Sequence, residues 1–385
     1  MTSTRIVVVG AGYAGVTAAN RIRARAGSDV TVTMVNPIPE FVERIRLHQH
    51  AAGADPATRP LSEMLHRDVE VVVGSAATIG DGEVVLADGA DVGFDHLVYA
   101  VGSGPGGDVP GIENAHSVSS LDGSIGLRNA LDAARPDAVV TVIGGGLTGI
   151  ETAAEIAERR PGMAVRLLSS GVVAPGLSDG GRDAVLRSLD RLGVEVREHT
   201  PVTRIAPGEV TVAGGSTAAT DVVVWAGRFV VPDLARRSGL PVDEQGRLRT
   251  DETLTAVGRP DVIGVGDAVA PPDRVAHHLR MSCQAAIPLG VHGADTVLAR
   301  LKGREPKPLS IGMTLQCVSL GRGDGVVQVV HRDDSPRRLV LRGRRGSWVK
   351  EQICRGTVGL IAKYAGSYRG MPGPRSQSER VGVSA

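Results

Sequence analysis

The chain has 385 residues and a formal net charge of +1, with 42% hydrophobic residues but only 2% aromatic ones. This length exceeds the usual size of one hydrophobic core, so two or three domains are expected. The balanced charge argues against binding nucleic acid through an overall positive field. The three cysteines, Cys283, Cys317 and Cys354, are odd in number and far apart in the sequence, which indicates a reducing, cytoplasmic environment without a disulfide framework.

The first five residues lead directly into an apolar run, which leaves no room for a secretory signal peptide. No apolar stretch approaches the roughly 18 residues that a membrane-spanning helix needs. The sequence therefore predicts a soluble protein or, at most, a peripheral membrane protein.

The first apolar run, Ile6 to Val9, ends at a glycine-rich turn, Gly10-Ala11-Gly12-Tyr13-Ala14-Gly15, which is followed by a helical pattern. A strand, a turn of the form G-x-G-x-x-G and a helix are the fingerprint of a dinucleotide site. The next strand, Val30 to Val35, ends at Asn36, where the fingerprint asks for an acid that binds a ribose hydroxyl. An amide can make this hydrogen bond without charge assistance. The alternative is an α/β crossover that binds no nucleotide.

A second strand, turn and helix follow at Val140 to Ile143 and Gly144 to Gly149. Gly144 permits the tight turn, Gly146 lets the backbone approach a pyrophosphate, and Gly149 allows close packing of helix and strand. The following strand ends at Ser169-Ser170, whereas an acid there favours NAD and a basic residue favours NADP. Arg166 and Arg182 are either candidates for binding a 2′-phosphate or ordinary surface residues, so the choice of nucleotide stays open.

The same succession of elements follows each glycine turn. It consists of a helix, a strand, a small β excursion and an apolar strand that ends in glycine. The two units close at Ala100-Val101-Gly102 and Trp225-Ala226-Gly227, and this repetition predicts two nucleotide-binding domains. A later strand, Val262 to Val265, ends at Gly266-Asp267. Its carboxylate can either face a ribityl hydroxyl or cap a helix.

Between the motifs, residues 40–52 show apolar positions at helical spacing, and one of Arg44, Arg46 or His48 is expected to face a cofactor. His48 and His50 lie two residues apart, so on a helix they point to different faces, and no metal site is predicted. Residues 69–94 are expected to form an antiparallel meander.

The C-terminal region is expected to contain an antiparallel sheet over residues 314–341 and a basic, partly amphipathic segment over 348–368. Residues 331–370 hold ten Lys or Arg and three acids, an excess of +7. Such a segment can bind anionic lipid, or it can be a solvated face at an oligomer contact such as that of a homodimer. Residues 373–385 read as a disordered tail.

Together these patterns predict an α/β fold of two Rossmann-like, three-layer (ββα) dinucleotide-binding domains and a small C-terminal α+β region. The first domain is expected to be discontinuous, over residues 1–115 and 233–303. The second domain is expected over 116–232 and the C-terminal region over 304–372.

The ordered set of motifs resembles the flavoprotein reductases with two dinucleotide domains. The segments that carry the resemblance are Gly10 to Gly15, Ala100 to Gly102, Gly144 to Gly149, Trp225 to Gly227 and Gly264 to Asp267. Within this superfamily the chain looks most like type II NADH dehydrogenases and the mitochondrion-associated, apoptosis-inducing-factor-like quinone reductases. Residues 314–328 are similar to the segment that follows the flavin-binding motif in these proteins.

The resemblance implies FAD on the first glycine turn and NADH or NADPH, the electron donor, on the second. Glu151, which matches the helix glutamate of the family's second motif, is implied as the catalytic residue near the nicotinamide–flavin contact, although an acid in a helix's first turn is also simply favourable there. The cofactor-binding residues expected on this reading are Gly10, Gly12, Tyr13, Ala14, Gly15, Asn36, Arg46, Ala100, Gly102, Gly144, Gly146, Leu147, Thr148, Gly149, Gly227, Gly266, Asp267 and Ala285.

The sequence thus predicts an enzyme, an FAD-dependent NAD(P)H:acceptor oxidoreductase. Residues 40–53 contain no cysteine pair, so a dithiol relay beside the flavin is not expected and electrons are expected to pass directly to an acceptor, most simply a quinone. The alternatives are a reductase for a redox protein such as a ferredoxin, docked on the basic C-terminal region, and a nucleotide-responsive interaction protein that turns over slowly.

Overall fold

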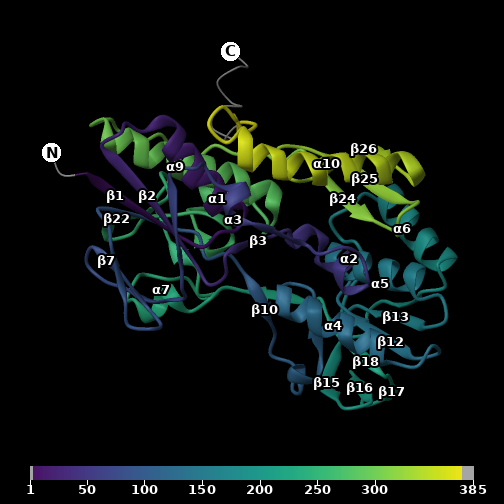
Figure 1. The fold of residues 1–385 in the computed structure, drawn as a ribbon. Helices are drawn as coiled ribbons and strands as arrows, with labels where there is room; N and C mark the ends of the chain where they lie inside the picture. Colours follow the sequence, from purple (N-terminus) through teal and green to yellow (C-terminus); the bar gives the residue numbers. More distant parts are fainter. Residues whose placement is uncertain (1–2, 375–385) are drawn as a thin grey trace.

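The computed structural model describes residues 3–374 (Figure 1). Its largest sheet is built on β1 (Thr4–Val9), which pairs in parallel with β2 (Val30–Asn36) on one side and β9 (His96–Tyr99) on the other. The sheet has the order β21-β22-β9-β1-β2-β5, and its remaining strands are β21 (Thr255–Ala256), β22 (Arg259–Gly264) and β5 (Val69–Val73). Strands from both the first 100 residues and residues 255–264 therefore form one sheet.

Helices α1 (Tyr13–Arg25) and α9 (Cys283–Leu301) pack against each other beside this sheet (Figure 1). Small residues permit the close approach, because a Cβ on Gly290 of α9 would lie 2.4 Å from the Ala14 carbonyl oxygen. The contact fixes the start of α1, and with it the first glycine turn, against α9.

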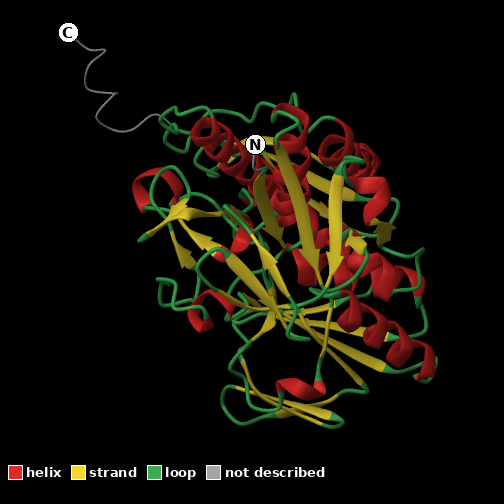
Figure 2. Cartoon of the chain, turned by 60° about the vertical axis from the view of Figure 1, so that its left-hand side comes forward, coloured by secondary structure: helices red, strands yellow, loops and turns green. Residues whose placement is uncertain are grey.

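A second sheet, of five parallel strands, has the order β11-β18-β12-β13-β14. Its strands are β11 (His116–Ser117), β18 (Val222–Trp225), β12 (Val139–Ile143), β13 (Ala164–Leu168) and β14 (Glu195–Arg197). Three helices pack around it, α4 (Leu121–Ala133), α5 (Leu147–Arg159) and α6 (Asp179–Arg191). Figure 2 shows the two large sheets with their helices.

Small antiparallel sheets accompany the two large ones. They are β6 (Ala76–Ile79), β7 (Glu83–Leu86) and β8 (Asp91–Gly93) in the first unit, and β15 (Val202–Ala206), β16 (Glu209–Val212) and β17 (Thr217–Ala219) in the second. The chain crosses between the units twice, at β10 (Gly104–Gly106) and β19 (Arg228–Val230), which pair antiparallel.

Two sequence expectations were wrong in detail. Residues 40–52 are not one helix but β3 (Glu40–Val42), the 3-10 turn η1 (Arg44–Arg46) and the short helix α2 (Leu47–Ala51), because β3 pairs with the distant β4 (Thr58–Pro60). Residues 69–73 do not belong to the antiparallel meander, because β5 pairs in parallel with β2.

The C-terminal region is a three-stranded antiparallel sheet followed by the long helix α10 (Gly343–Lys363). The strands are β24 (Leu315–Ser319), β25 (Gly325–Val330) and β26 (Pro336–Leu341). Helix α10 contacts α1 and α3 (Leu61–Met64) of the first unit as well as β24 and β25, so it lies along both halves of the molecule (Figure 1). Of the predicted disordered tail, 373–385, only Gly373 and Pro374 lie within the described residues. No helix within residues 3–374 is long and apolar enough to cross a membrane.

Candidate active site

A cavity of about 660 Å³ lies where the two glycine turns, the start of α9 and one face of α10 meet. Gly12 and Gly146 line it from the two turns, and Asp267 and Glu151 line it from the adjoining elements. The cavity therefore joins both dinucleotide motifs in a single site.

The first glycine turn has the shape of an open cradle. Gly10 has a φ of +103°, and a Cβ on Gly15 would lie 1.9 Å from the Gly10 carbonyl oxygen, so both positions need glycine for packing. A Cβ on Gly12, the residue before α1, would meet no atom within 4 Å. The open space at the start of a helix fits a pyrophosphate, which binds the free backbone N–H groups there.

The second turn repeats this geometry. Gly144 has a φ of +130°, and a Cβ on Gly149 would lie 2.0 Å from the Gly144 carbonyl oxygen. Gly146, directly before α5, again faces open space. The chain thus carries two equivalent cradles, and both fit a dinucleotide.

Asn36 braces the first turn from the end of β2. Its Oδ1 accepts a hydrogen bond from the Ala11 N–H at 2.9 Å, and its Nδ2 donates to the Ile38 carbonyl oxygen at 2.8 Å. A carboxylate could make only the first of these bonds. Asn36 is therefore anchored to the backbone of the turn and does not line the cavity.

Asp267 follows Gly266, which has a φ of +80°, and lines the cavity opposite the first turn. Its Oδ2 accepts a hydrogen bond from Ser103 Oγ at 2.7 Å, and Arg44 Nη1 lies 3.8 Å from the same oxygen. The Arg44 guanidinium also lies over the Phe229 ring, 5.7 Å from its centroid. These contacts place Arg44, rather than Arg46, at the cavity.

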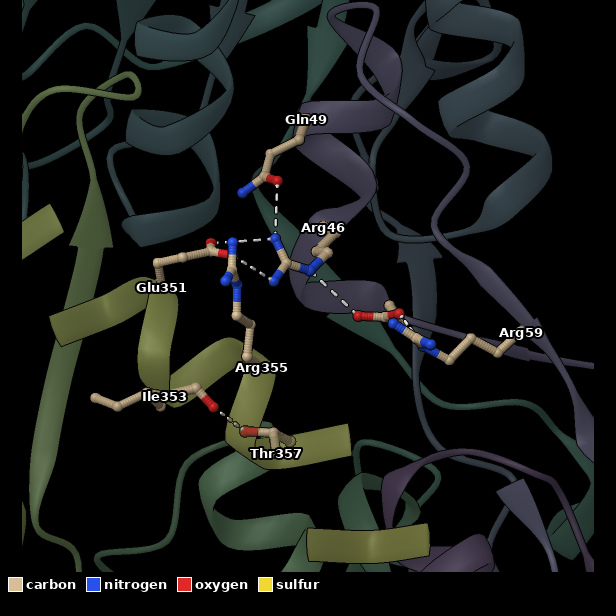
Figure 3. Close-up of polar contacts among 8 residues, drawn as sticks. Arg46, Gln49, Arg59, Glu351, Ile353, Arg355 and Thr357 are labelled. Carbon is tan, nitrogen blue, oxygen red and sulfur yellow. Dashed lines mark hydrogen bonds and ion pairs between the residues drawn. The ribbon is translucent and has the colours of Figure 1, made fainter. Parts of the chain in front are cut away.

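Arg46 instead joins α10 to the first unit (Figure 3). Its two terminal nitrogens donate to both carboxylate oxygens of Glu351 at 3.1 and 3.3 Å, and its Nε donates to Glu43 Oε2 at 3.2 Å. Glu43 is buried and also accepts a hydrogen bond from Arg59, while Glu351 accepts one from Arg355. Arg46 is thus part of a network that fixes the position of α10.

Glu151 lies in a cluster of ionisable groups on the cavity wall. Its Oε1 accepts a hydrogen bond from the Ser319 N–H at 2.9 Å and forms an ion pair with Lys350 Nζ. His48 Nδ1 lies 3.9 Å from Glu151 Oε2, while His48 Nε2 is buried without a hydrogen-bond partner among the described residues. This cluster draws one residue each from α5, α10 and α2.

Burial changes the protonation of the cluster. It lowers the pKa of Lys350 to about 8, so this ammonium can release a proton near neutral pH. Burial and the positive charge of Lys350 lower the pKa of His48 well below its ordinary value, so the imidazole is neutral. The cavity therefore holds a proton donor next to a carboxylate that can bind and orient it.

The three cysteines, distant in sequence, all line this cavity as free thiols. Burial raises the pKa of Cys283 to about 11 and that of Cys317 to about 12, and it also raises the pKa of Cys354. Because the thiolate is the nucleophile, these neutral thiols contribute soft apolar surface rather than reactive groups.

The structure brings most of the predicted site residues to the cavity. Those that line it are Gly12, Tyr13, Ala14, Ala100, Gly102, Gly146, Leu147, Thr148, Glu151, Gly227, Gly266 and Asp267. Those that do not line it are Gly10, Gly15, Asn36, Arg46, Gly144, Gly149 and Ala285. Four of the latter are the glycines that permit packing within the turns, and Ala285 is buried in α9.

Sequence reasoning missed Lys350, which belongs to the basic C-terminal segment and reads as a surface residue. A signal was present, because Lys350, Ile353, Cys354, Thr357 and Leu360 follow the spacing of one helix face and all line the cavity. Four of these five residues are uncharged, which marks that face as buried and Lys350 as an exception on it.

Comparison with known proteins places the chain in a family. Residues 4–290 match the family model of pyridine nucleotide-disulphide oxidoreductases. The chain belongs to this family. It is an oxidoreductase enzyme of the flavoprotein class, whose cofactors are FAD and NADH, and the predicted resemblance and α/β fold are both confirmed.

Relatives agree over most of the chain. It is 29% identical to the NADH dehydrogenase-like protein MT1860 of Mycobacterium tuberculosis, over 91% of this chain and 93% of that protein. It is 26% identical to the type II NADH:quinone oxidoreductase Ndh of Mycobacterium tuberculosis, over 78% of this chain and 74% of that protein. It is 27% identical to the demethylphylloquinone reductase NdbB of Synechocystis, over 57% of this chain and 56% of that protein.

Solved structures share the fold. The sulfide:quinone oxidoreductase of Aquifex aeolicus superposes with a TM-score of 0.81 at 16% identity, covering 97% of this chain and all of the other. NDH2 of Plasmodium falciparum, in complex with NADH, gives a TM-score of 0.78 at 14% identity, covering 95% and 99%.

Proposed function

We propose that the chain is an FAD-dependent NADH:quinone oxidoreductase. The first glycine turn and Asp267 hold FAD, and the second glycine turn holds the pyrophosphate of NADH. The shared cavity between the two cradles supports this assignment. The names of the relatives, a type II NADH:quinone oxidoreductase and a demethylphylloquinone reductase, support a quinone as the acceptor.

The reaction is NADH + H⁺ + quinone → NAD⁺ + quinol. The hydride brings two electrons and one proton, so the protein must provide the second proton from solvent through a group in the site. Bound FAD supplies the hydride-accepting chemistry and passes the electrons on. The chain's own residues bind, align and supply the proton.

The single observation that carries the proposal is the Glu151–Lys350–His48 cluster on the wall between the two cradles. Lys350 Nζ holds a proton that it can give to a reduced quinone oxygen, since its pKa is about 8. Glu151 keeps the ammonium oriented, and Ser319 N–H fixes the Glu151 carboxylate. The neutral His48 ring carries a hydrogen on one of its two nitrogens. When that nitrogen is Nε2, it can donate a hydrogen bond to a quinone carbonyl.

We further propose that the enzyme works at an anionic membrane surface through α10 and β26. Trp348, Leu339 and Tyr364 are exposed by 65%, 62% and 60%. The same elements also carry exposed arginines, Arg337, Arg338, Arg342, Arg344, Arg345 and Arg355. Ile353 and Met371 both line the cavity and are exposed, so the cavity opens toward this surface, where a lipid-soluble quinone would enter.

The test is direct. Purified protein is reconstituted with FAD, and NADH oxidation is followed with a short-chain ubiquinone or menaquinone and, separately, with an acidic ferredoxin. The proposal expects a flavin absorbance band, rapid bleaching by NADH and quinone-dependent turnover. Protein that binds no flavin, or that is bleached and reoxidised only by ferredoxin in a salt-sensitive reaction, contradicts it.

A further inference from the structure

Tyr13, the first residue of α1, carries a buried hydroxyl group that the rest of the protein does not use. The residue lines the cavity and is only 7% exposed. Its hydroxyl hydrogen has no acceptor among residues 3–374. A buried polar group without a partner is destabilising, so such a group in the wall of a ligand cavity indicates that it binds a ligand.

The surroundings of Tyr13 fix the direction and the protonation of this hydroxyl. Its ring packs edge to face against the buried Phe41 of β3, with the ring centroids 5.1 Å apart and the ring planes at 90°. Burial, and to a smaller extent the neighbouring Cys283 and Cys354, raise the pKa of Tyr13 well above its ordinary value. The hydroxyl therefore keeps its hydrogen at neutral pH and can act as a hydrogen-bond donor.

Cys354 relates Tyr13 to the Glu151–Lys350–His48 cluster. Lys350 and Cys354 lie four residues apart on α10 and both line the cavity. They are therefore on the same face of the helix, about 6 Å apart along its axis. Lys350 is paired with Glu151 from the second unit, whereas Tyr13 belongs to the first unit. The cavity thus has hydrogen-bond donors from both units along one face of α10.

A quinone matches two donors at separate places in one cavity. Its two carbonyl oxygens lie on opposite sides of one six-membered ring, and both accept hydrogen bonds. Ile353 and Leu360 line the same face of α10 and offer apolar surface to the ring. The pyrophosphate of FAD would bind backbone N–H groups at the start of α1, which leaves the Tyr13 side chain available to the acceptor.

We propose that the Tyr13 hydroxyl donates a hydrogen bond to one carbonyl oxygen of the quinone, opposite the oxygen that receives the proton of Lys350. This inference rests on the proposed quinone reduction. Tyr13 is on this account a substrate-binding residue that keeps its own hydrogen and transfers no proton. Two donors from different units fix the quinone ring in one orientation, whereas Lys350 alone would leave the ring free to turn.

The test uses Y13F, which removes only the hydroxyl. Binding of a short-chain ubiquinone to the oxidised, FAD-loaded protein is measured by isothermal titration calorimetry without NADH, so that no turnover occurs. The Kd of the quinone is expected to rise about tenfold in Y13F. Its KM is expected to rise by a similar factor, while kcat falls less than about threefold. The flavin absorbance band and its bleaching by NADH are expected to stay as in the wild type.

Y99F is the matched control. Tyr99 of β9 is fully buried, and its hydroxyl also has no hydrogen-bond partner among the described residues, but Tyr99 does not line the cavity. Both variants remove an unpaired buried hydroxyl, so both are expected to keep or raise the unfolding temperature of the FAD-loaded protein. Only Y13F is expected to weaken the binding of the quinone.

Unchanged Kd and KM of the quinone in Y13F overturn the proposal, as does an equal loss of quinone binding in Y99F. A Y13F protein whose flavin band shifts while quinone binding is unchanged also overturns it, because the hydroxyl then faces the flavin. A wild-type protein that is bleached by NADH but neither binds nor reduces the quinone instead contradicts the proposed function. The two failures are therefore distinct.

Discussion

Lys350 lines the cavity from the buried face of α10, whereas the other basic residues of this helix are exposed. Its lowered pKa follows from this burial. Lys363, on the same helix, is exposed, whereas Lys350 is buried against Glu151 and Cys354. The same residue type therefore lies in solvent at one position and, in the proposed function, supplies a proton at the other.

Replacing Lys350 by Met tests this role. Because the proton donor is lost while its apolar volume is kept, quinone-dependent turnover is expected to fall by about 10²-fold. Stopped-flow bleaching of the flavin by NADH is expected to change much less, since the hydride step needs no proton from Lys350. Lys363→Met, the matched control, is expected to retain wild-type turnover, and equal slowing of bleaching and reoxidation in Lys350→Met contradicts the assignment.

The pH dependence follows from the same pKa. The donor must carry its proton, so quinone turnover at saturating NADH is expected to be constant below pH 8 and to decline as the pH rises through about 8. The decline is expected to disappear in Lys350→Met, whose residual rate has no such group. If quinone turnover in Lys350→Met still declines at the same alkaline pH, the titrating group is another residue.

At the scale of elements, the position of α10 decides whether Lys350 meets Glu151. The Glu43–Arg46–Glu351 network anchors α10 one residue from Lys350 and is partly buried, with Arg46 and Glu351 exposed by 21% and 29% (Figure 3). Paired groups that are shielded from water cost more to separate than surface pairs. The network is thus a support for the cluster rather than a part of it.

Glu351→Gln is expected to lower the free energy of unfolding by about 1 kcal/mol, after allowing for solvent screening at these exposures. It is also expected to reduce quinone turnover more than flavin bleaching, because α10 moves relative to the cavity. The control is Arg355→Gln, which removes an exposed partner of Glu351 and is expected to cost less than about 0.5 kcal/mol. Chemical denaturation and steady-state assays measure both effects.

The network also predicts an acid sensitivity. Burial would raise the pKa of Glu351, but hydrogen bonds from Arg46 and Arg355 outweigh it and lower the pKa. Its stabilisation is therefore full above the pKa of the unfolded chain and is lost as the pH falls through the lower pKa of the folded chain. The stability difference between wild type and Glu351→Gln is expected to shrink over that acidic range.

The extent to which the elements were predictable follows from how local their signals are. Each glycine turn lies directly between its strand and its helix in the sequence, so motif and fold could be inferred together. The failure at residues 40–52 came from β3, whose partner β4 lies some sixteen residues later and leaves no local trace. Arg44 and Arg46 share one 3-10 turn, and only tertiary contacts show that the first faces the cavity and the second faces α10.

At the scale of the whole molecule, the cavity can be related to the exposed surface of α10 and β26. Helix α10 lines the cavity with one face, and the exposed residues of α10 and β26 combine apolar side chains with arginines. The sequence indicated the excess of +7 but left open whether it meets lipid or another subunit. The opening of the cavity at Ile353 and Met371 favours the lipid interpretation, because a long-chain quinone would come from the bilayer.

A vesicle flotation experiment tests this surface. Wild-type protein is expected to float with vesicles containing anionic lipid, less with zwitterionic vesicles, and less at high salt, because each arginine near the surface contributes about 1 kcal/mol. The variant W348A/R344Q/R345Q is expected to lose most of the binding while keeping its turnover with a water-soluble short-chain quinone, since none of these residues lines the cavity. Val257→Ala, which removes an exposed apolar residue on the turn between β21 and β22, is the control and should float like wild type. Unchanged flotation of the triple variant would assign the basic surface to another contact, and binding that persists at high salt would show that the arginines do not drive it.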